Sequence, residues 1–209
     1  MSRWMSCSTP PRNHSSAFSF EEINFLAEEI NTSLAFLRRE FPELRFTTSL
    51  HGDLRWLDVP LELDCLDVHF YADADERWTS RTRFNELTSD GLFSNDKWFA
   101  VFSDRSMKTA AALAPMLRAR QRFKATEFTN WAQRTGAPLT TSESWATWYY
   151  FDDPRLDWSW LLEWAKWSVE DAIACNFWGW TPHNYVQPQF GNWKDVTWHR
   201  TLTERFLGS

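Results

Sequence analysis

The chain has 209 residues, of which 43% are hydrophobic and 24% are charged, and this balance fits one globular domain with a sizeable core. Its net charge is −6, from 22 Lys and Arg against 28 Asp and Glu, and no basic stripe is present, which argues against a nucleic-acid partner. No run approaches the ~18 apolar residues of a membrane span, and no apolar segment typical of a secretion signal is visible near the first residue.

Tryptophan is the outlier of the composition. The chain contains 15 copies, and aromatic residues make up 17% of it. Because Trp buries a large area and carries a polar N–H group, two interpretations stay open. The indoles either pack a core heavily, or they form aromatic walls around a flat ligand such as a sugar ring.

The cysteines bear on the cellular compartment. Cys7, Cys65 and Cys175 are an odd and widely spaced set, which is neither a disulfide framework nor a zinc ligand set. We therefore expect a reducing, cytoplasmic location and no cofactor. A metal site that combines His51 with His69 is conceivable, but no ligand spacing in the chain supports it.

Residues 1–17 are rich in Ser, Pro and Arg and have no hydrophobic period, so we expect an irregular or disordered segment. A helix follows. Ser19 can cap it, Glu22 three residues later completes a capping box, and Pro42 ends it. Apolar residues recur at steps of three and four and give this helix one apolar face: Ile23, Leu26, Ile30, Leu34, Leu37 and Phe41.

Two strands are expected next. Residues 44–50 are strand-like, and residues 63–71 form a stronger strand with a nearly continuous apolar run at its centre. Such a run is typical of a strand buried on both faces, as in a parallel sheet. Residues 72–105 are polar and irregular, and they indicate a long connection with short helices.

A helix is expected over residues 107–135, divided at Pro115 and ended by Gly136. The pattern predicts that three aromatic residues of this helix face inward: Phe123, Phe128 and Trp131.

The remaining chain continues the alternation of strands and helices. Residues 137–145 predict a third strand, a helix with Asp157 as its cap follows, and residues 176–180 predict a fourth strand. A last helix is expected near residues 194–207. Strands that alternate with helices favour parallel βαβ units, so the predicted fold class is α/β.

Residues able to do chemistry lie at the ends of three of these strands. His69 and Tyr71 end the second strand, Glu143 lies near the end of the third, and Trp178 and Trp180 end the fourth. In an α/β barrel the active site lies at the carboxyl ends of the strands. The shared position therefore means more than any one of these residues alone.

Each of these residues also has a simpler interpretation. Glu143 can be a strand-end carboxylate that accepts hydrogen bonds from Ser142 or Ser144, and His69 can be a satisfied histidine at the rim. Three further indoles, at helical spacing, are more typical of a packed helix face than of a ligand site: Trp160, Trp164 and Trp167.

The ordered strand ends resemble strands six, seven and eight of retaining glycoside hydrolases with (β/α)8 barrels. The closer resemblance is to bacterial cellulase-like family proteins, and it covers residue 18 to the end of the chain. Three stretches carry it: TTSESW (140–145), LDWSW (156–160) and PQFGNWKDVTWHRTLTERF (188–206). By this resemblance, residues 18–209 correspond to strands five to eight, half of a TIM (β/α)8 barrel with about four parallel strands and flanking helices.

The resemblance implies hydrolysis of O-glycosidic bonds in an oligo- or polysaccharide by a two-carboxylate, double-displacement mechanism. Glu143 matches the nucleophile, and His69 and Tyr71 would orient the nucleophile or the substrate. Substrate binding would fall to aromatic side chains at strand ends and to polar residues of the loop after the fourth strand: Trp145, Trp178 and Trp180, and His183, Asn184 and Gln189.

The chain also departs from this family. The acid/base of these barrels follows strand four, usually in an Asn-Glu pair, but the only such pair here is Asn85-Glu86, inside the polar connection. Asp67, inside a strand, is expected to be structural, whereas Asp73 and Asp75 are placed to contact substrate. Strands one to four have no counterpart, so we expect either a fragment of an enzyme or a genuine half-barrel that self-associates through its exposed edges. The alternative function is a non-catalytic carbohydrate-binding remnant.

Overall fold

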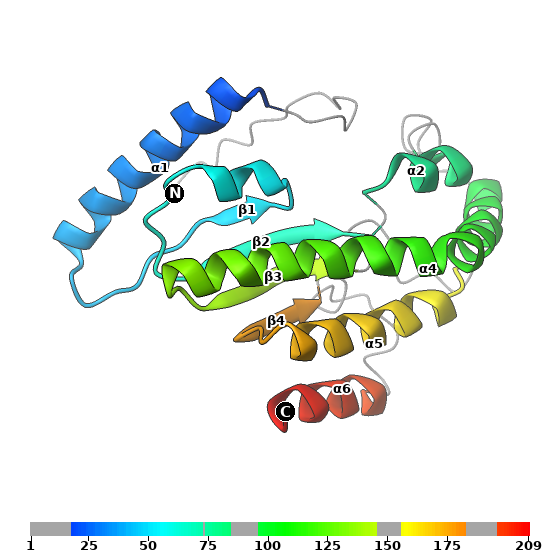
Figure 1. The fold of residues 1–209 in the computed structure, drawn as a ribbon. Helices are drawn as coiled ribbons and strands as arrows, with labels where there is room; N and C mark the ends of the chain where they lie inside the picture. The colour runs from blue at the N-terminus through cyan, green and yellow to red at the C-terminus, as the bar shows by residue number, and fades with distance from the viewer. Residues whose placement is uncertain (1–17, 73, 85–95, 146–155, 183–195) are drawn as a thin grey trace, which may run out of the picture.

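The computed structural model describes residues 18–72, 74–84, 96–145, 156–182 and 196–209; the segment 1–17 lies outside them. Four strands form one sheet in the order β1-β2-β3-β4, and each neighbouring pair is parallel (Figure 1). Their bounds are Ser49–His51, Leu66–Tyr71, Leu139–Trp145 and Gly179–Pro182. The predicted α/β class with four parallel strands and flanking helices is therefore confirmed.

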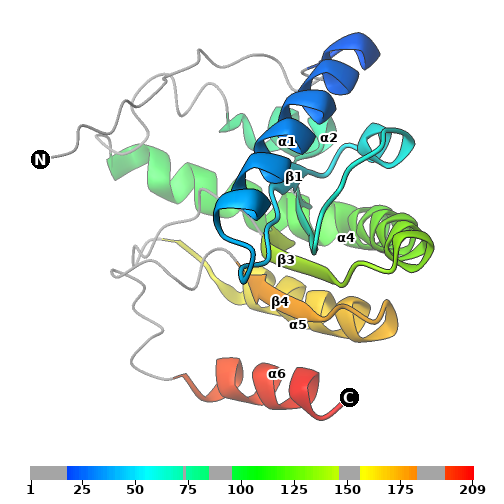
Figure 2. The ribbon, with the colours of Figure 1, turned by 90° about the vertical axis from the view of Figure 1, so that its left-hand side faces the viewer.

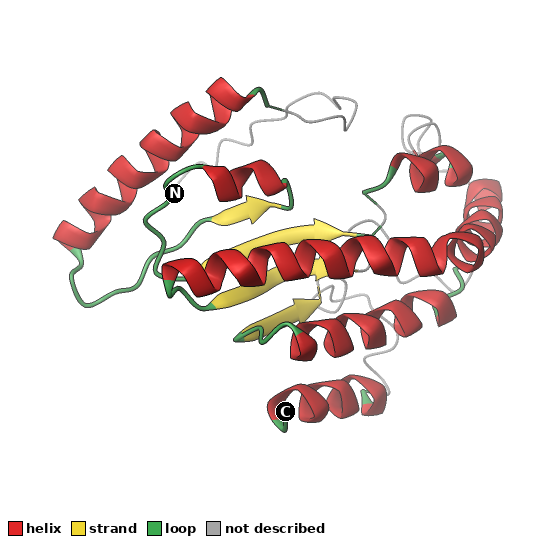
Figure 3. Cartoon of the chain, in the orientation of Figure 1, coloured by secondary structure: helices red, strands yellow, loops and turns green. Residues whose placement is uncertain are grey.

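Helices flank this sheet (Figure 3). They are α1 (Phe20–Glu40), the short 3₁₀ helix η1 (Leu54–Asp58), α2 (Glu76–Thr82), α4 (Asp96–Thr135), α5 (Ser159–Ala174) and α6 (Thr197–Leu207). Figures 1 and 2 show α4 and α5 lying across one face of the sheet, with α1 on the side of β1 and α6 on the side of β4. Across the described ranges, no helix is both long and apolar enough to span a membrane.

Helix α1 begins as the sequence predicts. The Glu22 backbone N–H donates to Ser19 Oγ at 3.1 Å, and the Ser19 N–H donates to Glu22 Oε2 at 2.6 Å. The two bonds satisfy amide donors that the first helical turn leaves without partners. The helix ends at Glu40, two residues before Pro42.

Helix α4 differs from the prediction in three ways. It begins at Asp96 and not at residue 107. It runs without interruption from Asp96 to Thr135, although Pro115 cannot donate a backbone hydrogen bond. The run AAALA just before Pro115 favours helix strongly enough to carry the helix past it, and Figure 1 shows that the helix bends along its course. The prediction that Phe123 faces inward is wrong, since its side chain is 58% exposed.

The geometry of the helix explains the error at Phe123. Phe128 and Trp131 are buried, as predicted, and they pack with the strands in the main core. Phe123 lies five positions before Phe128, which at 3.6 residues per turn rotates it by roughly 140° from the buried side. Gly136 ends the helix with a φ of 72°, the left-handed conformation expected of a glycine at that position.

Helix α5 and strand β4 begin at other residues than predicted. Trp158, not Asp157, is the N-cap of α5, although Asp157 Oδ1 accepts a 2.8 Å bond from the Ser159 N–H. Strand β4 starts at Gly179, not at residue 176, because the chain is still turning there. Asn176 has a φ of 53°, and the Phe177 N–H donates back to the Ala172 carbonyl.

The core that positions the site lies between the sheet and the helices. Leu66 and Val68 of β2 are fully buried, and they join Leu50 and Leu139 of the neighbouring strands against Phe128 of α4. Side chains alternate between the faces of a strand, so residues 67, 69 and 71 point to the other face. Strand β2 is thus apolar toward α4 and polar on its opposite side. Asp67 and Tyr71 on that side are also buried, so burial extends to both faces as predicted, although the second face is not apolar.

Candidate functional site

The polar face of β2 carries three functional side chains in alternation. Asp67 and Tyr71 are buried and His69 is half-buried. They face Ser142 and Glu143 of β3, which pairs with β2 in parallel. The topology therefore brings together the two strand ends that the sequence singled out, at residues 69–71 and at residue 143.

An irregularity in β3 decides how these side chains meet. Thr140 pairs with Asp67, but Ser144 pairs with Phe70, so β3 contains one residue more than β2 between these two pairs. Against β4, the register shifts in the same stretch, between Thr141 and Ser144. This is a β-bulge, which redirects side chains and is frequent beside active sites. It lets the adjacent residues Ser142 and Glu143 both reach His69, although residues next to each other in a regular strand point to opposite faces.

Glu143 accepts a hydrogen bond from one side chain of β2 and lies beside another. The Tyr71 hydroxyl donates to Glu143 Oε2 at 2.6 Å, and His69 Nδ1 lies 3.6 Å from the same oxygen. The hydrogen bond from Tyr71 to the carboxylate is short and charge-assisted, so it is a strong one. The Glu143 side chain is 42% exposed, so the carboxylate is oriented by the protein and still open to a ligand.

Asp67 lies beneath Glu143 and joins three strands. Its carboxylate accepts hydrogen bonds from Ser49 Oγ at 2.6 Å and from the backbone N–H and hydroxyl of Ser142, both at 2.7 Å. His69 Nε2 lies 3.3 Å away. Burial raises the pKa of Asp67, but the hydrogen bonds from His69, Ser49 and Ser142 together outweigh it and bring the pKa to about 2. Asp67 is therefore ionised throughout the physiological range.

His69 connects the two carboxylates. Its Nε2 lies 2.8 Å from Ser142 Oγ and 3.3 Å from Asp67 Oδ2, while its Nδ1 faces Glu143. The partner of one ring nitrogen sets which nitrogen carries the proton. The acceptor Asp67 favours a proton on Nε2, so Asp67 controls what the ring presents to Glu143.

The two tryptophans predicted to end the fourth strand lie before β4 and within it. Trp178 precedes β4, and its backbone N–H donates to the Leu139 carbonyl at the amino end of β3. Its side chain is 73% exposed. Trp180 pairs with Thr141 and packs on Phe206 of α6, with ring centroids 6.4 Å apart. The prediction that these residues end a strand is wrong, because β4 runs from Gly179 to Pro182.

The other predicted substrate-binding residues cannot be placed. Trp145 is the last residue of β3, opposite Tyr71, but its side chain lies outside the described part of the structure. Three residues lie in the segment 183–195, which is also outside it: His183, Asn184 and Gln189.

The aspartates after β2 do not both remain candidates for substrate contact. Asp73 lies outside the described residues. Asp75 is buried, caps α2 and pairs with Arg77 at 2.9 Å and Arg120 at 2.5 Å. Burial raises the pKa of Asp75, but the bonds and charges of Arg77 and Arg120 lower it overall. This carboxylate is already engaged by the fold.

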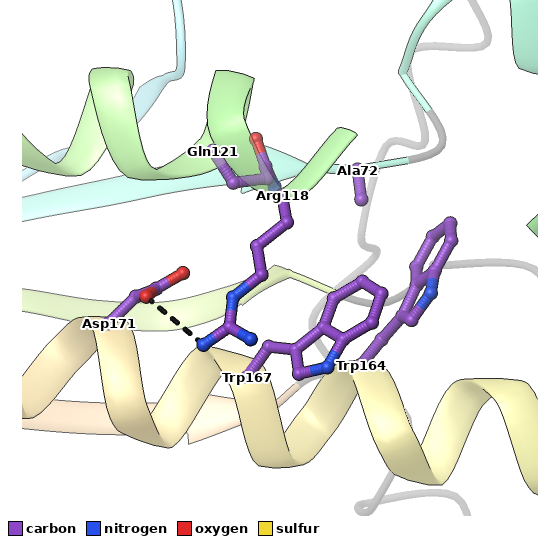
Figure 4. A pocket seen from close by; sticks show the side chains of 6 residues that line it. All are labelled: Ala72, Arg118, Gln121, Trp164, Trp167 and Asp171. Atoms are coloured by element: carbon purple, nitrogen blue, oxygen red, sulfur yellow. Dashed lines mark ion pairs between the residues drawn. The ribbon is translucent and has the colours of Figure 1, made fainter. Parts of the chain in front are cut away.

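The helix tryptophans form a packed cluster, as their spacing indicated. Trp160 and Trp164 are buried, and both rings lie within 5.2 Å of the Trp78 ring, centroid to centroid. A small hollow beside them is lined by Ala72, Arg118, Gln121, Trp164, Trp167 and Asp171 (Figure 4). Arg118 there lies 3.7 Å from Asp171 and stacks over Trp167. These groups join α4 to α5 on the face of the sheet opposite Glu143.

Sequence reasoning missed Ser49 and Ser142, and it assigned Asp67 only a structural role. The signal that points to Asp67 is the alternation of Asp67, His69 and Tyr71, which predicts one shared strand face. No local signal marks Ser142, because its role depends on the bulge. In the described ranges, no group of three or more His, Cys, Asp or Glu residues is arranged to hold a metal ion.

Comparison with solved structures supports the fold. The crystal structure of a protein provisionally described as a glycoside hydrolase, from Parabacteroides distasonis ATCC 8503, matches with a TM-score of 0.70 and 24% sequence identity. The match covers 86% of this chain and 48% of that protein, so the chain spans about half the length of its structural relative. No curated protein matches the chain.

A family model matches nearly the whole sequence. This family is named cellulase-like and described as sugar-binding cellulase-like, and its model matches residues 4–207. The chain therefore belongs to the sugar-binding cellulase-like family.

Proposed function

We propose that this chain carries the nucleophile half of a retaining glycoside hydrolase, with Glu143 as the nucleophile on O-glycosidic bonds of an oligo- or polysaccharide. The observation that carries the proposal is the short hydrogen bond from Tyr71 to Glu143, beside His69, at the carboxyl ends of β2 and β3. Membership of the cellulase-like family supports a carbohydrate ligand, and the fold is that of half a glycoside-hydrolase-like chain.

The chemistry follows from this geometry. A carboxylate that attacks an anomeric carbon must be ionised, accessible and fixed in direction. The Tyr71 hydroxyl fixes the direction of the carboxylate through Oε2, and the partial exposure of Glu143 leaves room for the sugar. Attack would form a glycosyl ester on Glu143 and expel the leaving oxygen.

The second carboxyl group of the mechanism is not Asp67 or Asp75. A general acid must hold a proton at working pH, but the pKa of Asp67 is about 2 and that of Asp75 is also lowered. We therefore propose that the acid/base is supplied from outside the described residues. Cleavage of unactivated glycosides by this chain alone would then be slow, by roughly 10²–10⁴-fold relative to an enzyme with its acid in place.

Sugar binding without hydrolysis is the second candidate function. It is favoured because neither Asp67 nor Asp75 can serve as the general acid, and because the family is described as sugar-binding. Both candidates predict that the chain binds oligosaccharides, but only the first predicts that Glu143 forms a covalent bond to the sugar.

The test uses substrates that need no acid. 2,4-Dinitrophenyl 2-deoxy-2-fluoro-β-glycosides of glucose, galactose, mannose, xylose and cellobiose carry a leaving group that departs without protonation, and the fluorine slows hydrolysis of the ester. Intact-protein mass spectrometry should show the mass of one glycosyl unit added, and peptide mapping should place it on Glu143.

Two variants sharpen this test. Glu143→Gln should abolish labelling, whereas Glu28→Gln, at an exposed position of α1, should label like the unmodified chain. A second readout is Glu143→Ala with sodium azide and the non-fluorinated dinitrophenyl β-glycosides, in which azide displaces dinitrophenolate and yields the α-glycosyl azide. Oligosaccharide binding by calorimetry without labelling by any of the glycosides would reject hydrolysis in favour of binding alone.

A further inference from the structure

The bulge in β3 creates a structural problem that Asp67 solves. A bulge inserts a residue that the neighbouring strand cannot pair, so a backbone amide in the bulged stretch needs another acceptor. Ser142 lies in that stretch, and its N–H donates to Asp67 Oδ1 at 2.7 Å. The same side chain accepts the Ser142 hydroxyl through Oδ2, also at 2.7 Å. Asp67 thus binds Ser142 at two points.

Asp67 also fixes the ring that faces Glu143. His69 Nε2 lies 3.3 Å from Asp67 Oδ2 and 2.8 Å from Ser142 Oγ, and its Nδ1 lies 3.6 Å from Glu143 Oε2. On the far side, Ser49 of β1 donates to Asp67 at 2.6 Å. Two routes therefore lead from Asp67 to Glu143, one through the backbone of the bulge and one through His69.

We propose that Asp67 is the positioning residue of this site, which holds the β3 bulge and the His69 ring so that Glu143 meets Tyr71 and the sugar. The inference deepens the proposed function and depends on it for its consequence in catalysis. Asp67 does not touch Glu143 or the reacting atoms, so it acts through Ser142 and His69.

Stability alone does not require a carboxylate at this position. Burying a carboxylate carries a desolvation penalty, and well-packed apolar residues often stabilise a protein as well as or better than a buried charge. A neutral side chain at residue 67 would avoid that penalty, but it would leave the Ser142 amide without its acceptor and the His69 ring without an anion to hold Nε2–H. The carboxylate is therefore best explained by the geometry it imposes.

The first experiment measures that geometry without any catalysis. Amide hydrogen exchange is followed residue by residue in the unmodified chain, in Asp67→Asn and in Asp67→Ala. Asp171→Asn is the matched control, since Asp171 is equally buried but lies in α5, against the other face of the sheet. The Ser142 amide should exchange at least about tenfold faster in Asp67→Ala than in the control, whereas Asp67→Asn should largely retain protection because its amide oxygen can still accept from Ser142.

The two variants should differ in the His69 ring. Ring nitrogen NMR should find the proton on Nε2 in the unmodified chain, and both variants should shift the proton toward Nδ1, because neither offers an anionic acceptor. Asp171→Asn should leave the tautomer unchanged. Because Asp67→Asn preserves the size of the side chain, it supplies this readout even if Asp67→Ala does not fold.

The second experiment follows labelling by the fluoroglycosides. The rate constant at saturating reagent should fall roughly 100-fold in Asp67→Ala, as a misplacement of about 1 Å can cause, and less in Asp67→Asn. The reagent concentration at half-saturation should change little, since Asp67 does not touch the sugar. The inference would be overturned if Asp67→Ala were labelled at the same rate as the unmodified chain. It would also be overturned if neither variant changed the exchange rate of the Ser142 amide or the tautomer of His69. If the unmodified chain is not labelled at all, the proposed function fails, and the exchange and NMR data alone decide the role of Asp67.

Discussion

The two faces of the four-stranded sheet differ in what their side chains do. Toward α4 and α5 the strands present Leu50, Leu66, Val68 and Leu139, which pack a buried core. Toward the other face, β2 and β3 present Asp67, His69, Tyr71, Ser142 and Glu143, which are joined by hydrogen bonds and close polar contacts. One face thus stabilises the fold, and the other carries a polar network that is costly to build and suited to a ligand. Because side chains alternate along a strand, a single strand can contribute core residues to one face and functional residues to the other.

The largest expected effect is on the core face. Phe128→Ala should lower the free energy of unfolding by about 3–5 kcal/mol, because Phe128 is fully buried and its removal leaves a cavity. Phe123→Ala, on the exposed side of the same helix, should change it by no more than about 0.5 kcal/mol. Urea unfolding followed by circular dichroism measures both. Equal losses in the two variants would contradict the assignment of the buried face.

The next effect is on the polar face and depends on pH. The pKa of Asp67 is lowered from 3.8 to about 2 in the folded chain, so its ionised form stabilises the fold above pH ~4, and that stabilisation is lost as pH falls toward 2. The amount is about 2 kcal/mol. The difference in unfolding free energy between the unmodified chain and Asp67→Asn should therefore shrink between pH 5 and pH 3.

Asp171, on the helix side of the sheet, should change the stability of the fold with pH in the opposite direction. Burial raises the pKa of Asp171 despite its pairing with Arg122 and Arg118, so its charge is unfavourable to folding and the penalty grows as pH rises through its pKa. Asp171→Asn should thus become relatively more stable than the unmodified chain as pH increases. If the two aspartate variants showed the same pH slope, the contrast between the faces would be lost.

A smaller effect isolates the contact that holds Glu143. In a double-mutant cycle, Tyr71→Phe and Glu143→Ala should be coupled by about 1 kcal/mol in unfolding free energy, because each removes one partner of the 2.6 Å bond. Partial exposure of Glu143 keeps the value below that of a fully buried charged bond. Strictly additive losses would show that the bond contributes nothing in solution.

The smallest effect is predicted at Trp178, before β4. Because this indole is mostly exposed at the amino end of the sheet, Trp178→Ala should change stability by no more than about 0.5 kcal/mol. Oligosaccharide affinity, measured by calorimetry, should be unchanged within about twofold, well under 1.4 kcal/mol. A tenfold loss of affinity would return Trp178 to the binding site.

Much of the architecture could be predicted because its causes are local. The Ser19–Glu22 capping box involves neighbouring residues and formed as expected. The alternation of strands and helices predicted the parallel sheet, and strand ends in a parallel sheet meet at one edge. That is why Glu143, His69 and Tyr71 were found as a group before their contacts were known.

Two of the errors arise where the outcome depends on distant parts of the chain. Phe123 faces solvent because the packing of α4 on the sheet, and not its own hydrophobicity, sets the buried side. Trp180 turns to α6 because β4 starts three residues later than its composition suggests. In each case tertiary packing overrode a local preference.

The sequence by itself determined the class of fold, the start of α1 and the functional residues near the ends of two strands, because propensity, capping and alternation act over a few neighbouring positions. Only the tertiary structure decided that β3 contains a bulge and that Asp67 holds it. Asp67 and Ser142 are 75 positions apart, and the register that brings them together is set by the pairing of two strands across a long helix.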